Sequence, residues 1–406
     1  MSNNDLWICC QIGAREHYAI SRALYSERLL LKLITDAWVL PGTTLKKIRG
    51  MRERYHHGLS ADLVDSWNYS TLFFEARQRL RAANGWQVIM SRNRWFQCKA
   101  INALKRISRS LNRYSSREVV LFAYSYAARD LLHFAKSQGW KTVLGQIDPG
   151  PVMESISEDL MAMHPQFAYE REKAPAEYWD SWHQECSLAD RIIVNSSWSK
   201  TSLLSSEVFG EKIKIVPLAY AAPQGAESFE REYPESFSFA RPFRVLFLGQ
   251  VTALKGILPL LEAAQLLEAH PIEFIIVGAL RLNLPDSVFK RANLRWVGAV
   301  ERGKVSWYYQ NADMFIFPSF SDGFGLTQLE AQAWKLPLLS SSYCGDVVVN
   351  EKNGILLDSV SGDCIADSLL RCLKSPSLLL NYSRYSSISE QYSFNQLALN
   401  LKNLWN

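Results

Sequence analysis

Apolar runs and segments with helical spacing alternate along the first half of the chain. Short runs rich in Val, Ile and Leu predict buried strands at 6–12, 29–36, 119–124, 141–147 and 191–197. Residues 13–28 predict a glycine turn that enters a helix, and residues 128–139 predict another helix. Wholly apolar strands that are separated by helices are typical of a parallel sheet covered on both faces.

A segment rich in proline, glycine, serine and charge, residues 221–242, interrupts this alternation. The apolar runs that follow it predict strands at 243–251, 273–279, 294–300, 313–319, 336–342 and 354–358. Helical spacing predicts helices at 256–270, 364–375 and 393–406. The fold class is therefore α/β, with two successive parallel-sheet domains that face a central cleft at the carboxyl ends of their strands.

The predicted organisation has four parts. An N-terminal domain spans 1–222, a linker 223–242, a C-terminal domain 243–385, and a closing helix 386–406 that packs back towards the N-terminal domain. A length of 406 residues agrees with more than one hydrophobic core.

Composition indicates a globular protein, with 48% apolar and 21% charged residues. The best candidate for a membrane span, residues 29–40, is interrupted by Lys32 and Asp36, and the first residues lack the pattern of a signal peptide. The seven cysteines are dispersed without zinc-ligand spacing, which fits a reducing compartment. We therefore expect a cytoplasmic protein.

The net charge of +5 conceals an asymmetry, because residues 1–117 hold 20 Lys and Arg against 8 Asp and Glu. Within it, residues 92–117 carry basic side chains and no acid, and apolar residues recur there at helical spacing. Two interpretations stay open: a basic amphipathic helix that lies on an anionic membrane surface, or an ordinary surface helix with a solvated basic face. The first would make the protein peripheral on the cytoplasmic membrane face.

Residues 315–336, FIFPSFSDGFGLTQLEAQAWKL, run from an apolar strand through a glycine loop into a helix. Gly323 and Gly325 allow close backbone approach to a ligand, and the free N–H groups at the helix start favour negative charge. Asp322 in the loop and Glu330 in the helix can both reach that ligand, where carboxylates accept hydrogen bonds from sugar hydroxyls. Alone, the motif is equally compatible with a strand-to-helix turn that carries two solvated acids.

A second glycine turn, LFLGQVTALKG at 246–256, places Lys255 beside another helix start, a suitable position for binding a diphosphate. With VGAL at 277–280, VGAV at 297–300 and SDGFGLTQLEAQAWKLPLLSS at 321–341, this string resembles the C-terminal domain of retaining glycosyltransferase family 4, the glycosyl transferases group 1. The family has the GT-B fold of two Rossmann-like domains. The resemblance covers roughly residues 185–375 well and the N-terminal half only in architecture.

The resemblance implies a nucleotide-sugar site in the C-terminal domain. Lys255 would neutralise the diphosphate, Asp322 would bind the transferred sugar and Glu330 the ribose. The other donor-site residues would be Gly249, Gln250, Gly298, Gly323, Phe324, Gly325 and Leu326, with residues 296–299 near the nucleobase. A UDP- or GDP-sugar would serve as co-substrate, without a metal or another cofactor, and no nucleic-acid partner is expected.

The N-terminal domain would supply the acceptor side, through Gly13, Arg15, His17 and Gln146. Asp148 follows a predicted strand, where it could act with Lys255 and Asp322 by orienting the acceptor hydroxyl, or simply form a turn.

Two further groups of polar residues are less specific. Ser196, Ser197 and Lys200 could meet the donor across the cleft or cap the helix that begins there. His56 and His57 have no evident partner in the sequence, so we expect them at the surface.

Three positions depart from the family pattern. Gln250 stands where arginine is common, Asp322 where glutamate is common, and Gln146 with Asp148 where a histidine is common. The leading hypothesis is a retaining glycosyltransferase that moves a hexose from a nucleoside-diphosphate sugar to a hydroxyl acceptor, such as a lipid-linked saccharide, in polysaccharide or glycolipid assembly. The alternatives are a catalytically impaired nucleotide-sugar-binding scaffold or partner subunit and, more weakly, a GT-B epimerase.

Overall fold

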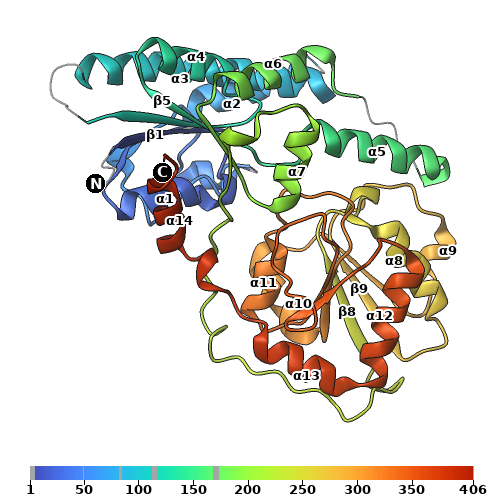
Figure 1. Cartoon of the computed structure of the whole chain (residues 1–406). Helices are drawn as coiled ribbons and strands as arrows, with labels where there is room; N and C mark the ends of the chain where they lie inside the picture. The colour runs from blue at the N-terminus through green and yellow to red at the C-terminus, as the bar shows by residue number, and fades with distance from the viewer. Residues whose placement is uncertain (1–4, 49, 82–84, 112–116, 168–172, 406) are drawn as a thin grey trace.

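Each half of the chain folds around its own parallel β-sheet, and the two halves lie one above the other in Figure 1. The computed structural model describes residues 5–48, 50–81, 85–111, 117–167 and 173–405. The first sheet has seven strands in the order β3-β2-β1-β4-β5-β6-β7, and the second has six in the order β10-β9-β8-β11-β12-β13. All neighbouring strands are parallel, which confirms the predicted fold class.

The strands of the first sheet are β1 (Leu6–Gln11), β2 (Leu30–Thr35), β3 (Val64–Asp65), β4 (Val119–Tyr124), β5 (Lys141–Gly145), β6 (Arg191–Val194) and β7 (Ile213–Ile215). Its helices are α1 (Ala19–Ser26), α2 (Asn68–Leu80), α3 (Gly85–Leu111), α4 (Arg129–Ser137), α5 (Pro151–Met163), α6 (Ala176–Leu188) and α7 (Ser197–Ser205). All six residues of β4 are buried, because helices cover both faces of the sheet. Leu131 of α4 and Trp182 of α6 belong to the core on one face, and Ala19 and Ala23 of α1 to the core on the other.

The strands of the second sheet are β8 (Phe243–Leu248), β9 (Ile272–Val277), β10 (Leu294–Gly298), β11 (Met314–Phe317), β12 (Leu338–Ser340) and β13 (Gly354–Leu356). The helices in this half are α8 (Ile257–Leu266), α9 (Asp286–Phe289), α10 (Val305–Asn311), α11 (Thr327–Ala333), α12 (Gly362–Lys374), α13 (Pro376–Tyr385) and α14 (Phe394–Lys402). Leu260 of α8 and Leu369 of α12 share one core, whereas Tyr309 of α10 and Leu329 of α11 share the other.

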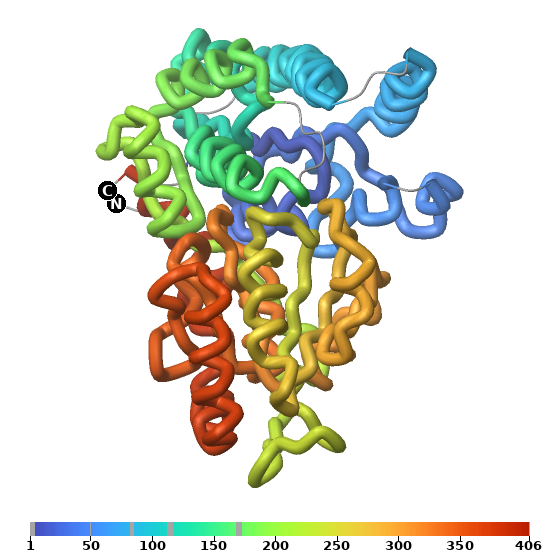
Figure 2. The backbone as a smooth tube through the Cα atoms, turned by 90° about the vertical axis from the view of Figure 1, so that its right-hand side faces the viewer, coloured from blue at the N-terminus to red at the C-terminus, as the bar shows by residue number. Residues whose placement is uncertain are grey.

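The C-terminal helix returns to the first half of the chain. In Figure 1, α14 lies beside α1, and in Figure 2 the last red segment of the chain reaches the side of the upper half. Leu397 and Leu401 of α14 are buried in the same core as Ala19 and Ala23 of α1. The predicted packing of the closing helix against the N-terminal domain is thereby confirmed.

The predicted linker, residues 223–242, packs along the C-terminal half. The guanidinium of Arg231 donates hydrogen bonds to the carbonyls of Trp334, at 2.8 Å, and Ala312, at 2.6 Å. It also contacts the carbonyl of Tyr309. These bonds hold the segment against the C-terminal half. The domain bounds given above stay a prediction.

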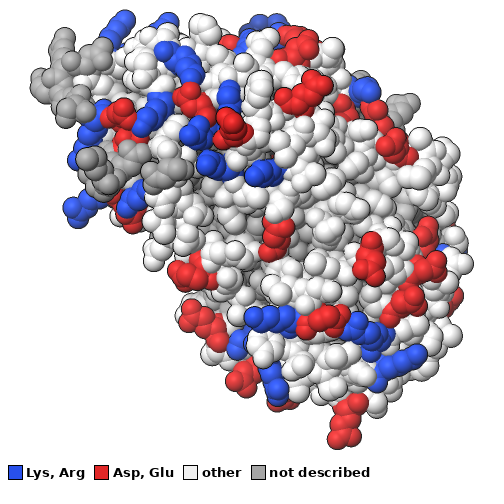
Figure 3. Space-filling view, in the orientation of Figure 1, with Lys and Arg blue, Asp and Glu red and all other residues white. Residues whose placement is uncertain are grey.

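Helix α3 is the predicted basic helix, although it begins at Gly85; residues 112–116 of that prediction lie outside the described residues. Its apolar residues Phe96 and Leu104 are buried in the core on the face of the first sheet that α4 and α6 also cover. This packing agrees with the surface-helix interpretation, and membrane contact through the basic face stays a prediction. In Figure 3, Lys and Arg side chains gather at the upper left, over the N-terminal half. Within the described residues, no helix is long and apolar enough to cross a membrane.

Candidate functional site

The loops at the carboxyl ends of the two sheets enclose two adjoining cavities. The first has a volume of 370 Å³ and is lined by Arg15, Lys255 and Asp322, with Gly249 and the segment Phe324–Thr327. The second has a volume of 560 Å³ and is lined by residues from both halves, including Glu330. Glu16, Leu248 and Leu326 line both, so the two cavities adjoin. We call them the loop cavity and the cleft cavity.

The glycine loop of the loop cavity connects β11 to α11. Gly325 has φ of +80°, a conformation that favours glycine, and a Cβ there would lie 2.5 Å from the ring of Phe317. The N–H of Phe324 donates to Asp322 Oδ1 at 3.2 Å, which orients that carboxylate at the loop.

Gly323 is required for a different reason from the one predicted. A Cβ at this position would lie 2.2 Å from the carbonyl oxygen of Ile147, in the other half of the chain. The Gly323 carbonyl accepts hydrogen bonds from Ser196 Oγ at 2.8 Å and Ser199 Oγ at 3.2 Å. Gly323 therefore permits close approach of the opposite backbone, and it does not line the loop cavity.

Ser196 also serves as the N-cap of α7, since its hydroxyl accepts from the N–H of Ser199 at 3.1 Å. The cap ends β6 at Val194, earlier than predicted. Of the two roles considered for Ser196, helix capping is observed, together with the contact to Gly323.

Lys255 lies opposite the glycine loop at the start of α8. Thr252 caps the preceding turn, and Gly256 has φ of +73°, where a Cβ would lie 1.8 Å from the Pro318 carbonyl oxygen. The α8 start is thus pressed against the loop, and Lys255 Nζ forms an ion pair with Asp322 Oδ2. The structure brings together the two charged residues that were 67 positions apart in the sequence.

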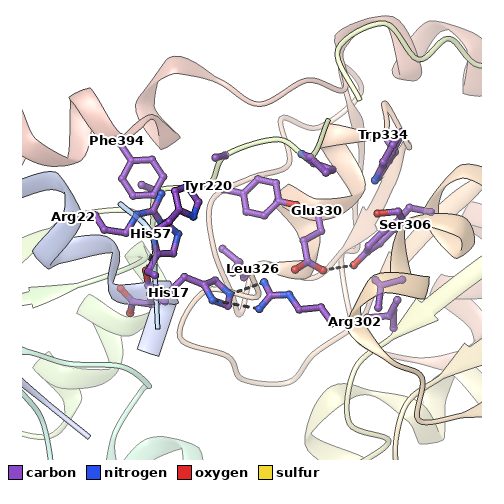
Figure 4. Close-up of a pocket in the computed structure, with 18 residues that line it drawn as sticks. His17, Arg22, His57, Tyr220, Arg302, Ser306, Leu326, Glu330, Trp334 and Phe394 are labelled. Atoms are coloured by element: carbon purple, nitrogen blue, oxygen red, sulfur yellow. Dashed lines mark hydrogen bonds between the residues drawn. The ribbon is translucent and has the colours of Figure 1, made fainter. Parts of the chain in front are cut away.

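Glu330 lies in the cleft cavity, on the wall that belongs to the second sheet (Figure 4). The hydroxyl of Tyr309, from α10, donates to Glu330 Oε2 at 2.9 Å. Burial raises the pKa of the Glu330 carboxyl, although this hydrogen bond opposes the shift. A carboxylate held in this way retains acceptor capacity for ligand hydroxyls in the cavity.

The opposite wall of the cleft cavity is rich in nitrogen-bearing side chains. Figure 4 shows His17, Arg22 and His57 on this wall, and Arg302 reaching across from the other half to His17. Two guanidinium nitrogens of Arg302 lie 2.5 Å and 3.3 Å from the ring nitrogens of His17. Burial, reinforced by Arg302, lowers the pKa of His17.

No partner for His56 and His57 is evident in the sequence, yet both side chains line the cleft cavity. Their rings stack at 4.6 Å, and His56 Nδ1 accepts from the N–H of Gly58 at 3.0 Å. Burial, together with nearby Arg22, lowers the pKa of His56 to about 4. No local spacing could have revealed this arrangement, because it depends on chain segments that meet only in the fold.

The segment between β1 and α1 differs from the predicted helix. Glu16, His17 and Tyr18 have φ of 49°, 51° and 61°, so three consecutive residues with side chains are left-handed. Each such residue costs about 1–2 kcal/mol relative to right-handed conformations. The hydroxyl of Tyr124 donates to Glu16 Oε2 at 2.9 Å, and Tyr18 is buried, which holds the segment in place. Helix α1 consequently begins at Ala19, and Glu16 and His17 lie at the cavities.

The remaining acceptor-side residues are in different environments. Arg15 lines the loop cavity, whereas Gly13 lines neither cavity and its N–H donates to Asp36 Oδ1 at 2.9 Å. Gln146 is buried, donating to Asp148 Oδ1 at 3.1 Å and accepting from Trp182 Nε1 at 2.9 Å.

Asp148 also accepts from the Tyr126 hydroxyl, at 2.5 Å, and from the N–H of Gly150, at 2.9 Å. Burial raises its pKa. Its carboxylate thus belongs to an internal network, and Asp148 lines neither of the two cavities.

Two predicted donor-site residues lie away from the cavities. Gln250 is exposed, and Gly298 ends β10 with φ of +77°, but neither lines the loop cavity or the cleft cavity. The segment expected near a nucleobase, 296–299, is likewise absent from the described lining of both cavities.

Comparisons with known proteins agree with this geometry. Residues 229–388 match the family described as Glycosyl transferases group 1. The chain is 22% identical over 236 residues to the capsular polysaccharide biosynthesis glycosyltransferase CapM of Staphylococcus aureus, covering 54% of this chain and 62% of that protein. It is 27% identical over 237 residues to the D-inositol 3-phosphate glycosyltransferase of Pseudarthrobacter chlorophenolicus, covering 52% and 54%. The matches thus span little more than half the length of these relatives.

Among solved structures, Anabaena HepE in complex with UDP matches with a TM-score of 0.58 and 12% identity, over 98% of both chains. At this identity the likeness shows the fold alone, which is the predicted GT-B arrangement of two facing parallel-sheet domains.

Proposed function

Residues 229–388 belong to the Glycosyl transferases group 1 family, and from this premise we propose that the whole chain is a retaining glycosyltransferase. It transfers a hexose from a nucleoside-diphosphate sugar to a hydroxyl acceptor. The observation that carries the proposal is the pairing of Lys255 with Asp322 at the loop cavity, beside the cleft cavity that holds Glu330.

Each of these side chains has a chemical role in the proposed reaction. Glu330 accepts hydrogen bonds from ribose hydroxyls, and Asp322 accepts them from the transferred sugar. Lys255 neutralises the diphosphate as its bond to the sugar breaks, which is the main electrostatic demand of the reaction. The N–H groups of Gly325 and Leu326, at the start of α11, donate further hydrogen bonds to the sugar nucleotide.

The reaction needs no enzyme nucleophile. The bond between the anomeric carbon and the diphosphate oxygen breaks, and the acceptor oxygen bonds to the same carbon on the same face. The acceptor proton passes to the leaving diphosphate, so the charge and atoms balance without a covalent enzyme intermediate.

Arg15 supplies the positive charge that Gln250 lacks. It enters the loop cavity from the N-terminal half, opposite Lys255, so it adds a second cation when a diphosphate binds. The donor is then held between the two halves of the chain, and Asp148 acts indirectly, by holding Tyr126.

Calorimetric titration with UDP, GDP and ADP, and with their sugars, tests the donor site. The HepE neighbour holds UDP, so UDP-sugars are the first to test. We expect tight binding of one nucleotide series by the wild type and about 10-fold weaker binding by Glu330→Ala, because a buried carboxylate is lost from the ribose contact. Unchanged affinity of Glu330→Ala for every nucleotide contradicts the proposed site.

The second candidate is a nucleotide-sugar-binding subunit without catalysis, which the exposed Gln250 and the shorter acid Asp322 favour. Relatives named for capsular polysaccharide and inositol phosphate glycosylation favour the enzyme, with a polysaccharide or glycolipid precursor as acceptor. Tight donor binding without turnover on a broad acceptor panel separates the scaffold from the enzyme.

A further inference from the structure

The wall of the loop cavity that belongs to the N-terminal half carries a neutral polar side chain. Three polar residues of this half line the cavity, namely Arg15, Glu16 and Asn195. Arg15 is a cation, and the carboxyl of Glu16 accepts the hydrogen bond from Tyr124 described above. Of the three, only Asn195 offers both a hydrogen-bond donor and an acceptor without a charge.

The carboxamide of Asn195 is buried but unpaired. The residue is only 8% exposed, and its amide atoms form no hydrogen bond within the part of the chain that the structure describes. None of the fully enclosed unpaired polar atoms in that part belongs to Asn195, so a ligand in the loop cavity can reach the amide. Because buried polar groups are almost always paired, an accessible unpaired amide at a cavity points to a hydrogen-bonding ligand.

Outside the loop cavity, Asn195 has little room for a partner. It also lines a separate space of 10 Å³, together with Tyr124, Gln146 and Leu397. This volume is at the lower limit for a single water molecule, whereas the loop cavity has 370 Å³. The loop cavity is therefore the side from which a ligand can pair with the amide.

The backbone at Asn195 is fixed against the glycine loop. Asn195 follows β6, which ends at Val194, and precedes Ser196, the N-cap of α7. The Ser196 hydroxyl donates to the carbonyl of Gly323, the neighbour of Asp322, at 2.8 Å. Asn195 and Asp322 are thus each one residue from this bond, and they line the cavity from the two halves. A side chain that the backbone positions in this way is preorganised for a ligand.

We infer that Asn195 binds a hydroxyl of the transferred hexose and so helps to determine which sugar is accepted. The inference rests on the proposed function, in which Asp322 holds the same sugar from the C-terminal half. The hexose is then held by both halves, beside the diphosphate at Lys255. A nucleoside diphosphate without a sugar does not reach Asn195, so this residue distinguishes the sugar nucleotide from the free nucleotide.

Calorimetric titration of the full chain tests the inference without an acceptor. The probes are UDP, GDP, UDP-glucose, UDP-galactose, UDP-N-acetylglucosamine and GDP-mannose, followed by the monodeoxy analogues of the sugar nucleotide that binds best. Asn195→Ala and Asn195→Ser both remove the carboxamide. Asn293→Ala is the matched control, because Asn293 is 7% exposed and lines neither the loop cavity nor the cleft cavity.

We expect both Asn195 variants to bind this sugar nucleotide about 5-fold more weakly, as for the loss of one hydrogen bond, and to bind the free nucleotide as the wild type does. In Asn293→Ala the ratio of the two affinities should stay at the wild-type value. Without ligand, Asn195→Ala should keep the wild-type melting temperature, since it deletes an unpaired group.

The monodeoxy analogues identify the hydroxyl that Asn195 contacts. One analogue should bind the wild type about 5-fold more weakly than the parent sugar nucleotide does. The same analogue should bind Asn195→Ala as tightly as the parent does, because the amide and the hydroxyl act as a pair. A merely structural role of Asn195 would not couple it to one hydroxyl.

Two results overturn the inference while the free nucleotide still binds. Either the sugar nucleotide binds both Asn195 variants as tightly as the wild type, or every monodeoxy analogue loses the same affinity in Asn195→Ala as in the wild type. Equal weakening of nucleotide and sugar nucleotide in the variants also counts against it. A wild type that binds no nucleotide contradicts the proposed function itself, and the inference falls with it.

Discussion

Lys255 is the cation that the C-terminal half contributes to the loop cavity, so its removal has a defined kinetic effect. We predict that Lys255→Ala lowers kcat for transfer about 10²–10³-fold, because the diphosphate leaves without its positive partner. Steady-state kinetics measures this, with Lys290→Ala as control, since Lys290 is exposed on the same half and lines neither cavity. Equal losses in the two variants contradict a specific role for Lys255.

Glu16 gives donor binding a pH dependence. Burial raises its pKa to about 7, so the side chain is neutral below that pH and negative above it. Because Glu16 lines both cavities, its charge opposes the diphosphate, and we predict several-fold weaker binding of UDP-sugar as the pH rises from 6 to 8.

Calorimetry across this range checks the prediction, with Glu16→Gln expected to flatten the profile. The pKa of His56 is lowered to about 4, so this ring does not titrate in the range, and the pKa of His17 is lowered as well. Arg15, Arg22, Arg302, Lys255 and Asp322 also face the cavities, and the pKa of Glu330 is raised too. If the pH dependence of binding is unchanged in Glu16→Gln, another group produces it.

At the residue scale, local motifs predicted Lys255, Asp322 and Glu330, because the glycine turns that carry them are continuous in sequence. The contact of Arg302 with His17 could not be predicted, since it joins residues 285 positions apart. The local sequence also did not indicate that glycine is needed at position 323 because of the Ile147 carbonyl of the other half, rather than because of a ligand.

At the element scale, the glycine loop joins the two halves as well as shaping the site. We predict that Gly323→Ala destabilises the fold by about 1–3 kcal/mol, because its Cβ overlaps the Ile147 carbonyl and forces the loop away from the segment that follows β5. Gly303→Ala is the matched control, since a Cβ there meets no atom within 4 Å. Denaturant unfolding measures both, and equal stability of the two variants contradicts the close approach.

Helix α14 gives the second prediction at this scale. Leu401 is 0% exposed in the core it shares with α1, so Leu401→Ala should lower the free energy of unfolding by about 2–5 kcal/mol. Leu399, on the same helix, is 48% exposed, and its replacement by alanine should change stability by less than about 0.5 kcal/mol. Similar losses in the two variants would mean that α14 does not pack as described.

Most long apolar strands and periodic helices were predictable, because their burial leaves a regular pattern along the chain. The two-residue β3 at a sheet edge was missed, since so short a strand carries no pattern. Residues 13–28 were predicted as a glycine turn that enters a helix, and the α-helix begins only at Ala19, because interactions with Tyr124 and the core hold residues 16–18 in a left-handed path.

At the scale of the whole molecule, the two sheets and the returning helix followed from the sequence, whereas the cavities did not. The loop and cleft cavities are built from both halves, so their shape depends on domain placement that no local pattern encodes. The excess of basic residues in the N-terminal half also belongs to this scale. Helix α3, which carries part of it, buries its apolar face in the core.

The central claim is that the two halves hold a nucleotide sugar between Lys255, Asp322 and Glu330 and transfer its sugar. The most direct measurement is sugar transfer from UDP- and GDP-sugars to saccharide acceptors, with the anomeric configuration of the product read by NMR. We predict transfer with retained configuration by the wild type, loss of nearly all transfer in Lys255→Ala, and about 10-fold less transfer from dilute donor in Glu330→Ala. Wild-type turnover in both variants, or inverted configuration in the product, contradicts the account.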